Sequence, residues 1–298
     1  MRPEGIFPAL VTPFNADESV SLTAVRDNIR LYNQTRIAGY VVLGSTGESV
    51  MLSRDEADAV LSAVREVASS EKILIAGTGA ESTAETIVRT KRAAALGYQF
   101  ALVKTPYYYK PVYRAETFLR HYRAVADASP IPVLLYSVPQ FTGITLETSE
   151  IVALAAHPNI LGIKDSSGNI QRVGEIVANA PPDFTVLTGG AAVIYPALAI
   201  GGRGAILALA AALPEKCAEV FELFETDRHE EARHLQLLLV QASRRIVGEH
   251  GIPGVKFAMD LRGYSGGVSR LPLLPLTEEK KQSIAAIVAQ LYPAAARV

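Results

Sequence analysis

The sequence predicts a (β/α)8 barrel followed by a helical extension at the C-terminus. Short runs rich in β-branched and apolar residues alternate with longer segments of helical periodicity, and the unit repeats after roughly 20 to 35 residues. Eight such runs occur, which is the number that closes a parallel barrel. After the eighth run, only helical patterns follow.

Each element of the barrel can be assigned in chain order. Strands are predicted at residues 6–10, 40–43, 73–76, 100–103, 133–135, 160–163, 185–187 and 205–207. Helices are predicted between them at residues 22–35, 54–68, 83–96, 116–128, 148–156, 170–180 and 192–200. Ser53 with Glu56, and Ser82 with Glu85, have capping-box spacing, which supports two of these helix starts.

The C-terminal part has a different pattern. Helices are predicted at residues 215–225, 229–247 and near 278–291, and the sequence GIPG at 251–254 predicts a turn. We therefore divide the chain into a barrel, residues 1–212, and a C-terminal helical extension, residues 213–298.

Composition limits the partners that this chain can have. The formal net charge is -1 and no long basic run occurs, which argues against nucleic acid or an anionic membrane as a partner. A single cysteine, Cys217, excludes a disulfide framework and fits a reducing compartment. No signal peptide is recognisable at the N-terminus, so we expect a cytoplasmic protein that acts on a small molecule.

Lys164 suggests a chemical function. It directly follows the apolar run at 160–163, and an unpartnered buried ammonium group costs stability. Burial disfavours the charged form of a lysine and leaves an amine that can attack a carbonyl carbon to form a Schiff base. A lysine at a strand end can also extend its ammonium group into solvent. The residues that follow the other strands must therefore decide between a reactive and a solvated lysine.

Several of these exits should meet Lys164, because reactive groups of such barrels lie at the C-terminal ends of the strands. The second strand leads into GSTGE, residues 44–48, whose hydroxyl and N–H groups can hold a carboxylate, although an ordinary glycine turn has the same pattern. The fifth strand leads to Tyr136, within reach of an imine on Lys164. The seventh strand leads to Gly189, and the eighth carries Ile206. This convergence favours chemistry at Lys164.

Other chemistries lack the residues that they need. The five histidines fall in predicted helices or at their ends, without the clustering that a metal-dependent aldolase requires. The sequence GTG at 77–79 lacks the third glycine of a dinucleotide site. We therefore predict no metal and no cofactor beyond a covalent lysine imine. A non-catalytic barrel that senses a keto acid is the alternative of a different class, and the combination of Lys164, Tyr136 and Ser45 argues against it.

The whole chain resembles the dihydrodipicolinate synthase and N-acetylneuraminate lyase family of class I aldolases. The resemblance rests on the motifs GSTGE, TPYYY, LYSVP, GIKDSSGN, LTGG and GIPGVKFAMD. It implies a barrel with a helical tail, a homotetramer built as a dimer of dimers, and a Schiff base between a lysine and pyruvate. By motif, that lysine is Lys164, the proton-relaying phenol is Tyr136, and the hydroxyl partner is Ser45. The tyrosine contributed by the neighbouring subunit is Tyr108, one of three tyrosines at 107–109 that we place at a subunit contact.

Phe141 marks a departure from the synthase pattern. Dihydrodipicolinate synthases carry an arginine there that holds the carboxylate of the aldehyde substrate, and a phenyl ring cannot replace it. Arg54 and Ala57 also stand where lysine-sensitive synthases have histidines. The sequences YSVP, HPNI and GIPGVKFAMD are more similar to 4-hydroxy-2-oxoglutarate aldolases, which release pyruvate and glyoxylate. Dihydrodipicolinate synthase and 2-keto-3-deoxy sugar acid aldolase remain the alternatives.

The proposed substrate has a second carboxylate that needs a binding site. Phe141 offers it no charge, so we expect Thr46, Ser166 and backbone N–H groups near Gly47 and Gly189 to hold it. Phe141 itself would narrow the loop and exclude the longer aspartate semialdehyde.

Overall fold

The computed structural model describes residues 2–293 and confirms the predicted barrel. All eight predicted strands are present, with ends within two residues of the prediction. They are β1 (Gly5–Pro8), β2 (Gly39–Val42), β3 (Ile73–Gly77), β4 (Phe100–Lys104), β5 (Val133–Ser137), β6 (Ile160–Asp165), β7 (Thr185–Thr188) and β8 (Gly204–Leu207).

Parallel pairing closes these strands into a ring. Each strand from β2 to β7 pairs with the next in the sequence, and β8 pairs with β1. The ring is completed between β1 and β2, where Leu10 N donates to Val41 O at 2.9 Å and Ala38 N donates to Ile6 O at 2.9 Å. All eight C-terminal strand ends therefore lie at one mouth of the barrel.

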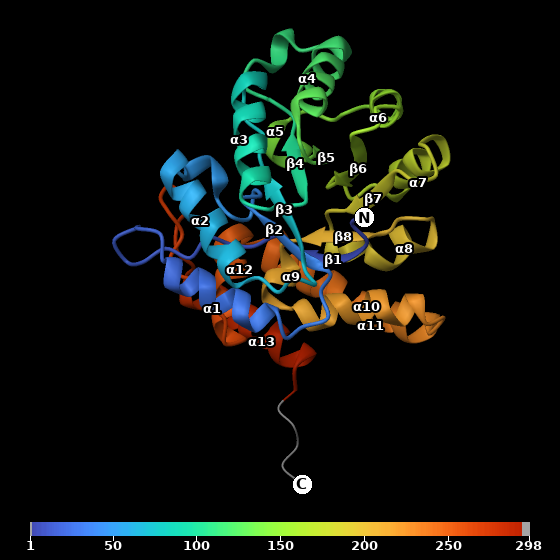
Figure 1. Cartoon of the computed structure of the whole chain (residues 1–298). Helices are drawn as coiled ribbons and strands as arrows, with labels where there is room; N and C mark the ends of the chain where they lie inside the picture. Colours follow the sequence, from blue (N-terminus) through green and yellow to red (C-terminus); the bar gives the residue numbers. More distant parts are fainter. Residues whose placement is uncertain (1, 294–298) are drawn as a thin grey trace.

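Helices cover the outside of this ring (Figure 1). The long ones are α1 (Leu22–Tyr32), α2 (Arg54–Val67), α3 (Thr83–Ala95), α4 (Ala115–Ala128), α6 (Thr148–Ala155), α7 (Ile170–Asn179) and α8 (Ile194–Ala199). Ser53 and Glu56 form the complete capping box at the start of α2, whereas Ser82 caps α3 through its hydroxyl alone. The sequence did not predict four short helical turns, namely η1 (Ser49–Met51), η2 (Lys110–Val112), α5 (Pro139–Thr142) and α9 (Leu209–Ala212). The helix predicted at 192–200 is formed by η3 (Ala191–Val193) and α8 together.

Apolar side chains fill the interior of the barrel. The inward-facing residues, each at most 1% exposed, include Phe7, Val41, Ile75, Leu102, Leu134, Leu187 and Ile206. Successive residues of a strand alternate between its two faces, so the residue two positions after an inward one also points inward. Lys104 follows Leu102 in this way on β4, and Tyr136 follows Leu134 on β5.

The C-terminal extension is helical, as predicted, but two of its elements differ from the prediction. It contains α10 (Pro214–Glu225), α11 (His229–Ala242), η4 (Ser243–Gly248), α12 (Gly251–Leu261) and α13 (Glu278–Leu291), which Figure 1 shows in orange and red on the β1 side of the barrel. The predicted helix at 229–247 changes at Ser243 into the π-helical segment η4. The predicted turn at 251–254 is wrong, because these residues form the first turn of α12. Pro253 is tolerated there, since an N–H group in the first turn has no helical partner.

Candidate active site

Lys164 and Tyr136 lie side by side at the mouth of the barrel. They are register partners on β6 and β5, and each side chain belongs to a residue that is only 4% exposed. Lys164 Nζ lies 4.2 Å from the centre of the Tyr136 ring. Among the described residues, no carboxylate lies within ion-pair distance of this ammonium group. Lys164 therefore lacks the ion pair that normally offsets the free-energy cost of burying an ammonium group.

Ser45 reaches the same place from the exit of β2. Its Oγ lies 3.3 Å from the phenolic oxygen of Tyr136, a separation that permits a hydrogen bond in either direction. The turn that carries it is sharply bent, because Leu43 and Glu48 on either side have φ angles of 60° and 53°. Non-glycine residues rarely adopt this left-handed conformation, and such strain concentrates at functional sites.

Buried contacts hold the strained turn in place. Glu48 Oε1 lies 2.6 Å from Lys256 Nζ, in an ion pair without hydrogen-bond alignment, and Glu48 Oε2 accepts from Arg270 N at 3.1 Å. Lys256 also donates to the carbonyl oxygens of Thr12 at 2.9 Å and Val268 at 2.6 Å. Helix α12 therefore anchors the turn that presents Ser45.

A second buried ion pair fixes the loop after Lys164. Asp165 Oδ2 accepts from Arg172 Nε at 2.8 Å, and Asp165 Oδ1 accepts from Ser167 N at 3.0 Å. Arg172 additionally donates to the carbonyl of Leu146. Both charged groups are almost completely buried. This arrangement sets the direction of the loop and hence the position of Ser166.

A cavity of about 560 Å³ opens in front of Lys164. Four predicted site residues line it together with Lys164, Tyr136 and Ser45, namely Thr46, Phe141, Ser166 and Gly189. A Cβ atom on Gly189 would lie 1.9 Å from Ser166 Oγ, so only glycine allows these two strand exits to approach each other. The structure thus brings seven of the predicted residues to one cavity.

The other three predicted residues lie outside it. Ile206 is completely buried in the interior of the barrel, and Gly47 packs with its N–H group bonded to Gly44 O at 3.1 Å. Tyr108 is 71% exposed and lines neither the Lys164 cavity nor its neighbour. It shares no cavity with Tyr136 in its own chain, and the contribution of Tyr108 to a neighbouring subunit stays a prediction.

A smaller cavity of about 270 Å³ adjoins the first one. The two share Ser45, Tyr136, Val138, Phe141 and Ile252 as lining residues. Lys104 and Tyr107 line only the smaller cavity. Burial lowers the pKa of Lys104, and Glu81, whose Oε1 lies 3.3 Å from the ammonium nitrogen, opposes this effect.

Sequence reasoning missed the contributions of Lys104 and of the C-terminal helices. Ser243, Arg244 and Val247 on η4, and Ile252 on α12, line the Lys164 cavity. π-Helical segments are rare and often occur at functional sites, but they have no simple sequence pattern. Lys104 did have a signal, because it ends an apolar strand run as Lys164 does.

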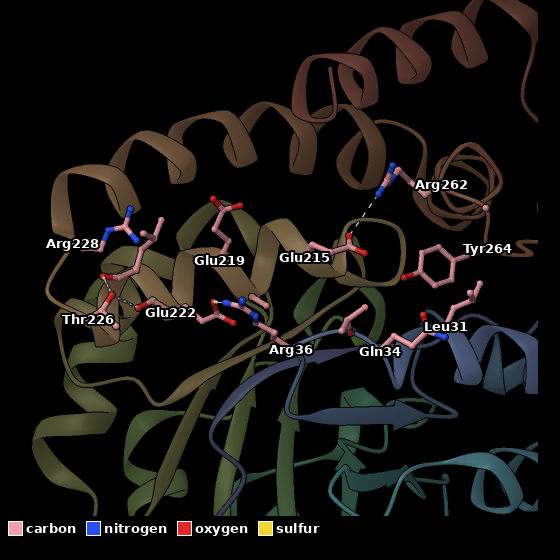
Figure 2. Close-up of a pocket in the computed structure, with 14 residues that line it drawn as sticks. Leu31, Gln34, Arg36, Glu215, Glu219, Glu222, Thr226, Arg228, Arg262 and Tyr264 are labelled. Carbon is pink, nitrogen blue, oxygen red and sulfur yellow. Dashed lines mark hydrogen bonds and ion pairs between the residues drawn. The ribbon is translucent and has the colours of Figure 1, made fainter. Parts of the chain in front are cut away.

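A further hollow, of about 880 Å³, lies elsewhere in the molecule (Figure 2). Figure 2 shows Glu215, Glu219 and Glu222 along α10, near Arg36 and Arg262. Arg36 pairs with Glu222 at 2.6 Å, and Arg262 lies 3.9 Å from Glu215. Arg36 precedes β2, so this hollow is at the N-terminal end of the strands, where barrels of this kind do not place their chemistry.

The geometry at the mouth defines a class of protein. Within the described chain, Lys164 has no carboxylate partner, and the oxygen of the adjacent Tyr136 lies 3.3 Å from the hydroxyl oxygen of Ser45. This arrangement suits the formation and protonation of an imine. Aldolases of class I work in this way: the protonated imine accepts the electron pair of the carbon–carbon bond that breaks. Among residues 2–293, no group of three or more histidine, cysteine, aspartate or glutamate side chains is placed to bind a metal ion.

Comparison with known proteins gives the family. Residues 2–291 match the Dihydrodipicolinate synthetase family, and the chain belongs to it. It is thus a carbon–carbon lyase of a family that uses a lysine Schiff base with pyruvate. No helix in the described part of the chain is both long and apolar enough to span a bilayer.

Relatives in this family carry two different names. A 4-hydroxy-tetrahydrodipicolinate synthase of Archaeoglobus fulgidus is 37% identical, over 97% of this chain and 98% of the relative. A probable mitochondrial 4-hydroxy-2-oxoglutarate aldolase of Emericella nidulans is 38% identical, over 92% of this chain and 91% of the relative. Identity to the two is nearly equal, so it does not discriminate between the two substrates.

Solved structures agree with the fold. A dihydrodipicolinate synthase of Bacillus anthracis has a TM-score of 0.93 and 29% identity, over 99% of this chain and 100% of that chain. A chloride-inhibited synthase of Acinetobacter baumannii, solved with pyruvate, has a TM-score of 0.91 and 31% identity, over 96% of this chain and 97% of that chain.

Proposed function

We propose that this protein cleaves 4-hydroxy-2-oxoglutarate to pyruvate and glyoxylate through an imine on Lys164. The observation that carries the substrate assignment is Phe141, which is 68% exposed and lines both cavities. It stands where the synthases of the family carry a carboxylate-binding arginine. A phenyl ring cannot form the charged, two-pronged hydrogen bond of a guanidinium group.

The proposed reaction starts with attack of the Lys164 amine on the C2 carbonyl of the substrate. Water leaves and a protonated imine forms. The C4 hydroxyl group gives its proton to the Tyr136 oxygen as the phenolic proton passes to Ser45, whose own proton passes to water in the cavity. The C3–C4 bond breaks, and the electron pair moves to the imine nitrogen to give an enamine. Glyoxylate departs, C3 takes up a proton that returns along the same relay, and water hydrolyses the imine to release pyruvate.

Tyr136 and Ser45 form the proton relay in this scheme. Their oxygens are 3.3 Å apart, so a proton on Tyr136 can pass to Ser45 without movement of the backbone. The strained turn around Ser45 is held by buried groups, which keeps this distance fixed when substrate enters.

The neutral groups of the Lys164 cavity bind the substrate in this proposal. Thr46 is 9% exposed and lines the same cavity as Ser166. The N–H groups at Gly47 and Gly189 are less suited than expected, since they donate to Gly44 O at 3.1 Å and Asp165 O at 2.6 Å. Phe141 narrows the entrance and disfavours aspartate semialdehyde.

Dihydrodipicolinate synthesis is the second candidate. Its support is the name 4-hydroxy-tetrahydrodipicolinate synthase, which several relatives carry, among them the one of Archaeoglobus fulgidus, 37% identical over nearly the full length of both chains. Activity toward 2-keto-3-deoxy sugar acids is a third possibility, for which the cavity of about 560 Å³ leaves room.

The decisive experiment measures kcat/KM for all three reactions on one preparation. We expect cleavage of 4-hydroxy-2-oxoglutarate to exceed condensation of pyruvate with aspartate semialdehyde by about 10- to 100-fold, because a lost charged hydrogen bond has an effect of this size. A higher value with aspartate semialdehyde would reverse the substrate assignment and leave the Schiff-base mechanism intact. Highest activity on a sugar acid would favour the third candidate.

A further inference from the structure

Lys104 is a second lysine on the inward face of the barrel. It ends β4 in register with Tyr136, which is itself in register with Lys164. The side chain of Lys104 is only 15% exposed. A Cβ atom on Gly79 would lie 2.8 Å from Lys104 Cγ, so a glycine at the exit of β3 makes room for the lysine. Tyr136 therefore stands between two inward-facing lysines.

The cavity beside Lys104 adjoins the cavity in front of Lys164. The smaller cavity, of about 270 Å³, has Ser45 and Tyr136 in the wall that it shares with the Lys164 cavity. Its other walls are largely apolar, with Leu43, Leu102 and Met51 among them. A carboxylate that extends from the imine past Tyr136 would meet Lys104 in surroundings of low polarity, where charge pairs interact strongly.

The uncharged donors of the Lys164 cavity are too few to bind both carboxylates of the proposed substrate well. The N–H groups of Gly47 and Gly189 already have acceptors within the chain. Thr46 and Ser166 remain near Lys164, and the keto-acid carboxylate next to the imine competes for them. The distal carboxylate thus lacks a charged partner in the larger cavity, apart from Arg244.

Arg244 is a weaker candidate than Lys104. Its side chain is 79% exposed, and its Nε lies 3.2 Å from Glu249 Oε1. Water screens such an exposed guanidinium group, so an additional carboxylate gains little from it. Of the side chains that line the two cavities in the described chain, the cationic ones are Lys104, Lys164 and Arg244.

The existing partner of Lys104 leaves it free to bind an anion. Glu81 Oε1 lies 3.3 Å from the ammonium nitrogen, while Glu81 Oε2 accepts from Tyr107 N and Tyr108 N at 2.9 Å each. The carboxylate of Glu81 is thus divided among three donors. An ammonium group has three protons to donate, so Lys104 can retain its contact with Glu81 and also donate to a second carboxylate.

We propose that Lys104 binds the distal carboxylate of the aldehyde portion of the substrate, in the small cavity behind Tyr136. This inference rests on the proposed function, because it needs an aldehyde that carries a carboxylate. In this proposal, Lys104 at the end of β4 supplies the positive charge that synthases supply from the loop position of Phe141.

The test compares two substrates that differ in this carboxylate alone. Cleavage of 4-hydroxy-2-oxoglutarate is measured beside cleavage of 4-hydroxy-2-oxopentanoate, in which a methyl group replaces the distal carboxylate. We expect Lys104→Met to lower kcat/KM for the dicarboxylate by about 10- to 100-fold, and that for the methyl analogue by much less. Lys104→Arg should recover part of the loss. Borohydride trapping with pyruvate checks that each variant is folded.

Glu81→Gln is the matched control for a structural role. If Lys104 merely orders the tyrosine loop through Glu81, Lys104→Met and Glu81→Gln will lower both reactions by the same factor, which would overturn the inference. If the wild type instead prefers aspartate semialdehyde, the same variants are compared with that aldehyde and acetaldehyde as partners of pyruvate. A selective loss there supports Lys104 although the proposed substrate is wrong. A wild type that accepts neither carboxylated substrate overturns both proposals.

Discussion

Lys164 and Lys256 are both almost completely buried, at 4% and 2% exposure, yet their surroundings differ. Lys256 has the carboxylate of Glu48 at 2.6 Å and two carbonyl acceptors. Lys164 has the face of the Tyr136 ring at 4.2 Å and an open cavity. Burial alone therefore does not mark a reactive lysine. A candidate reactive lysine is distinguished by the lack of a carboxylate partner together with a cavity that a small molecule can enter.

The two lysines are connected through one turn. Lys256 holds Glu48, and Glu48 ends the strained turn whose Ser45 lies 3.3 Å from the Tyr136 oxygen. Lys256 thus has a structural position, because its ion pair with Glu48 holds the turn that places Ser45 next to Tyr136. Changes at either lysine should separate stability from chemistry, which makes this comparison testable.

Lys164→Ala should have the largest effect, a loss of all measurable turnover, because the variant lacks the amine that forms the imine in the proposed mechanism. Borohydride reduction in the presence of pyruvate, followed by peptide mass analysis, should place the adduct of the wild type on Lys164 and give none in the variant. An adduct on Lys256 or Lys104 in the wild type would contradict the comparison.

Tyr136→Phe should retain the imine and slow turnover by roughly 10² to 10⁴, the range for a lost acid–base group. Ser45→Ala should act in the same direction, since it removes the other oxygen of the 3.3 Å contact. Steady-state rates and trapping with pyruvate together check this. A fall in trapping as large as the fall in rate would show that Tyr136 acts on imine formation instead.

Lys256→Met should destabilise the fold by about 3 to 5 kcal/mol, because it leaves the Glu48 carboxylate buried without a counter-ion. Urea unfolding measures the change, and trapping should still place the pyruvate adduct on Lys164. Glu48→Gln with Lys256→Met serves as the control and should be less destabilising than Lys256→Met alone. Unchanged stability would remove the structural role of Lys256.

Tyr108→Phe should lower the rate by about 10²-fold if a neighbouring subunit contributes this phenol to the relay. Tyr109→Phe is the control, since the two rings are packed edge to face, 5.0 Å apart, and both are largely exposed in one chain. Sedimentation tests the expected homotetramer. A fully active monomer, or a Tyr108→Phe variant with the wild-type rate, would rule out the shared relay.

The smallest expected effect is the contribution of Glu56 to the pH dependence of stability. Hydrogen bonds from Arg270, with smaller contributions from Ser53, lower the pKa of Glu56 from 4.5 to about 2. Since the folded-state pKa is lowered, this stabilisation is complete above pH 4.5 and is lost as the pH falls toward 2. Glu56→Gln should cost about 1 kcal/mol at pH 7, after allowance for solvent screening, and much less at pH 2.5. Urea unfolding at the two pH values measures the difference, and equal losses would exclude this contribution.

The sequence alone determined the barrel, its eight strands and the position of the candidate lysine. Strand and helix periodicity are local properties, so the runs at 133–135 and 160–163 could be recognised without any contact information. The convergence of Ser45, Tyr136 and Lys164 followed from strand order, because parallel strands end at the same mouth.

Tertiary structure decided the features that depend on distant parts of the chain. The turn predicted at 251–254 became the start of α12, and the end of the predicted helix at 229–247 became the π-helical segment η4, which lines the cavity. The sequence also could not predict whether Lys104, Lys164 or Lys256 has a carboxylate partner. Each depends on which side chain another element brings within about 4 Å, and sequence patterns describe the face that a residue occupies, not what that face meets.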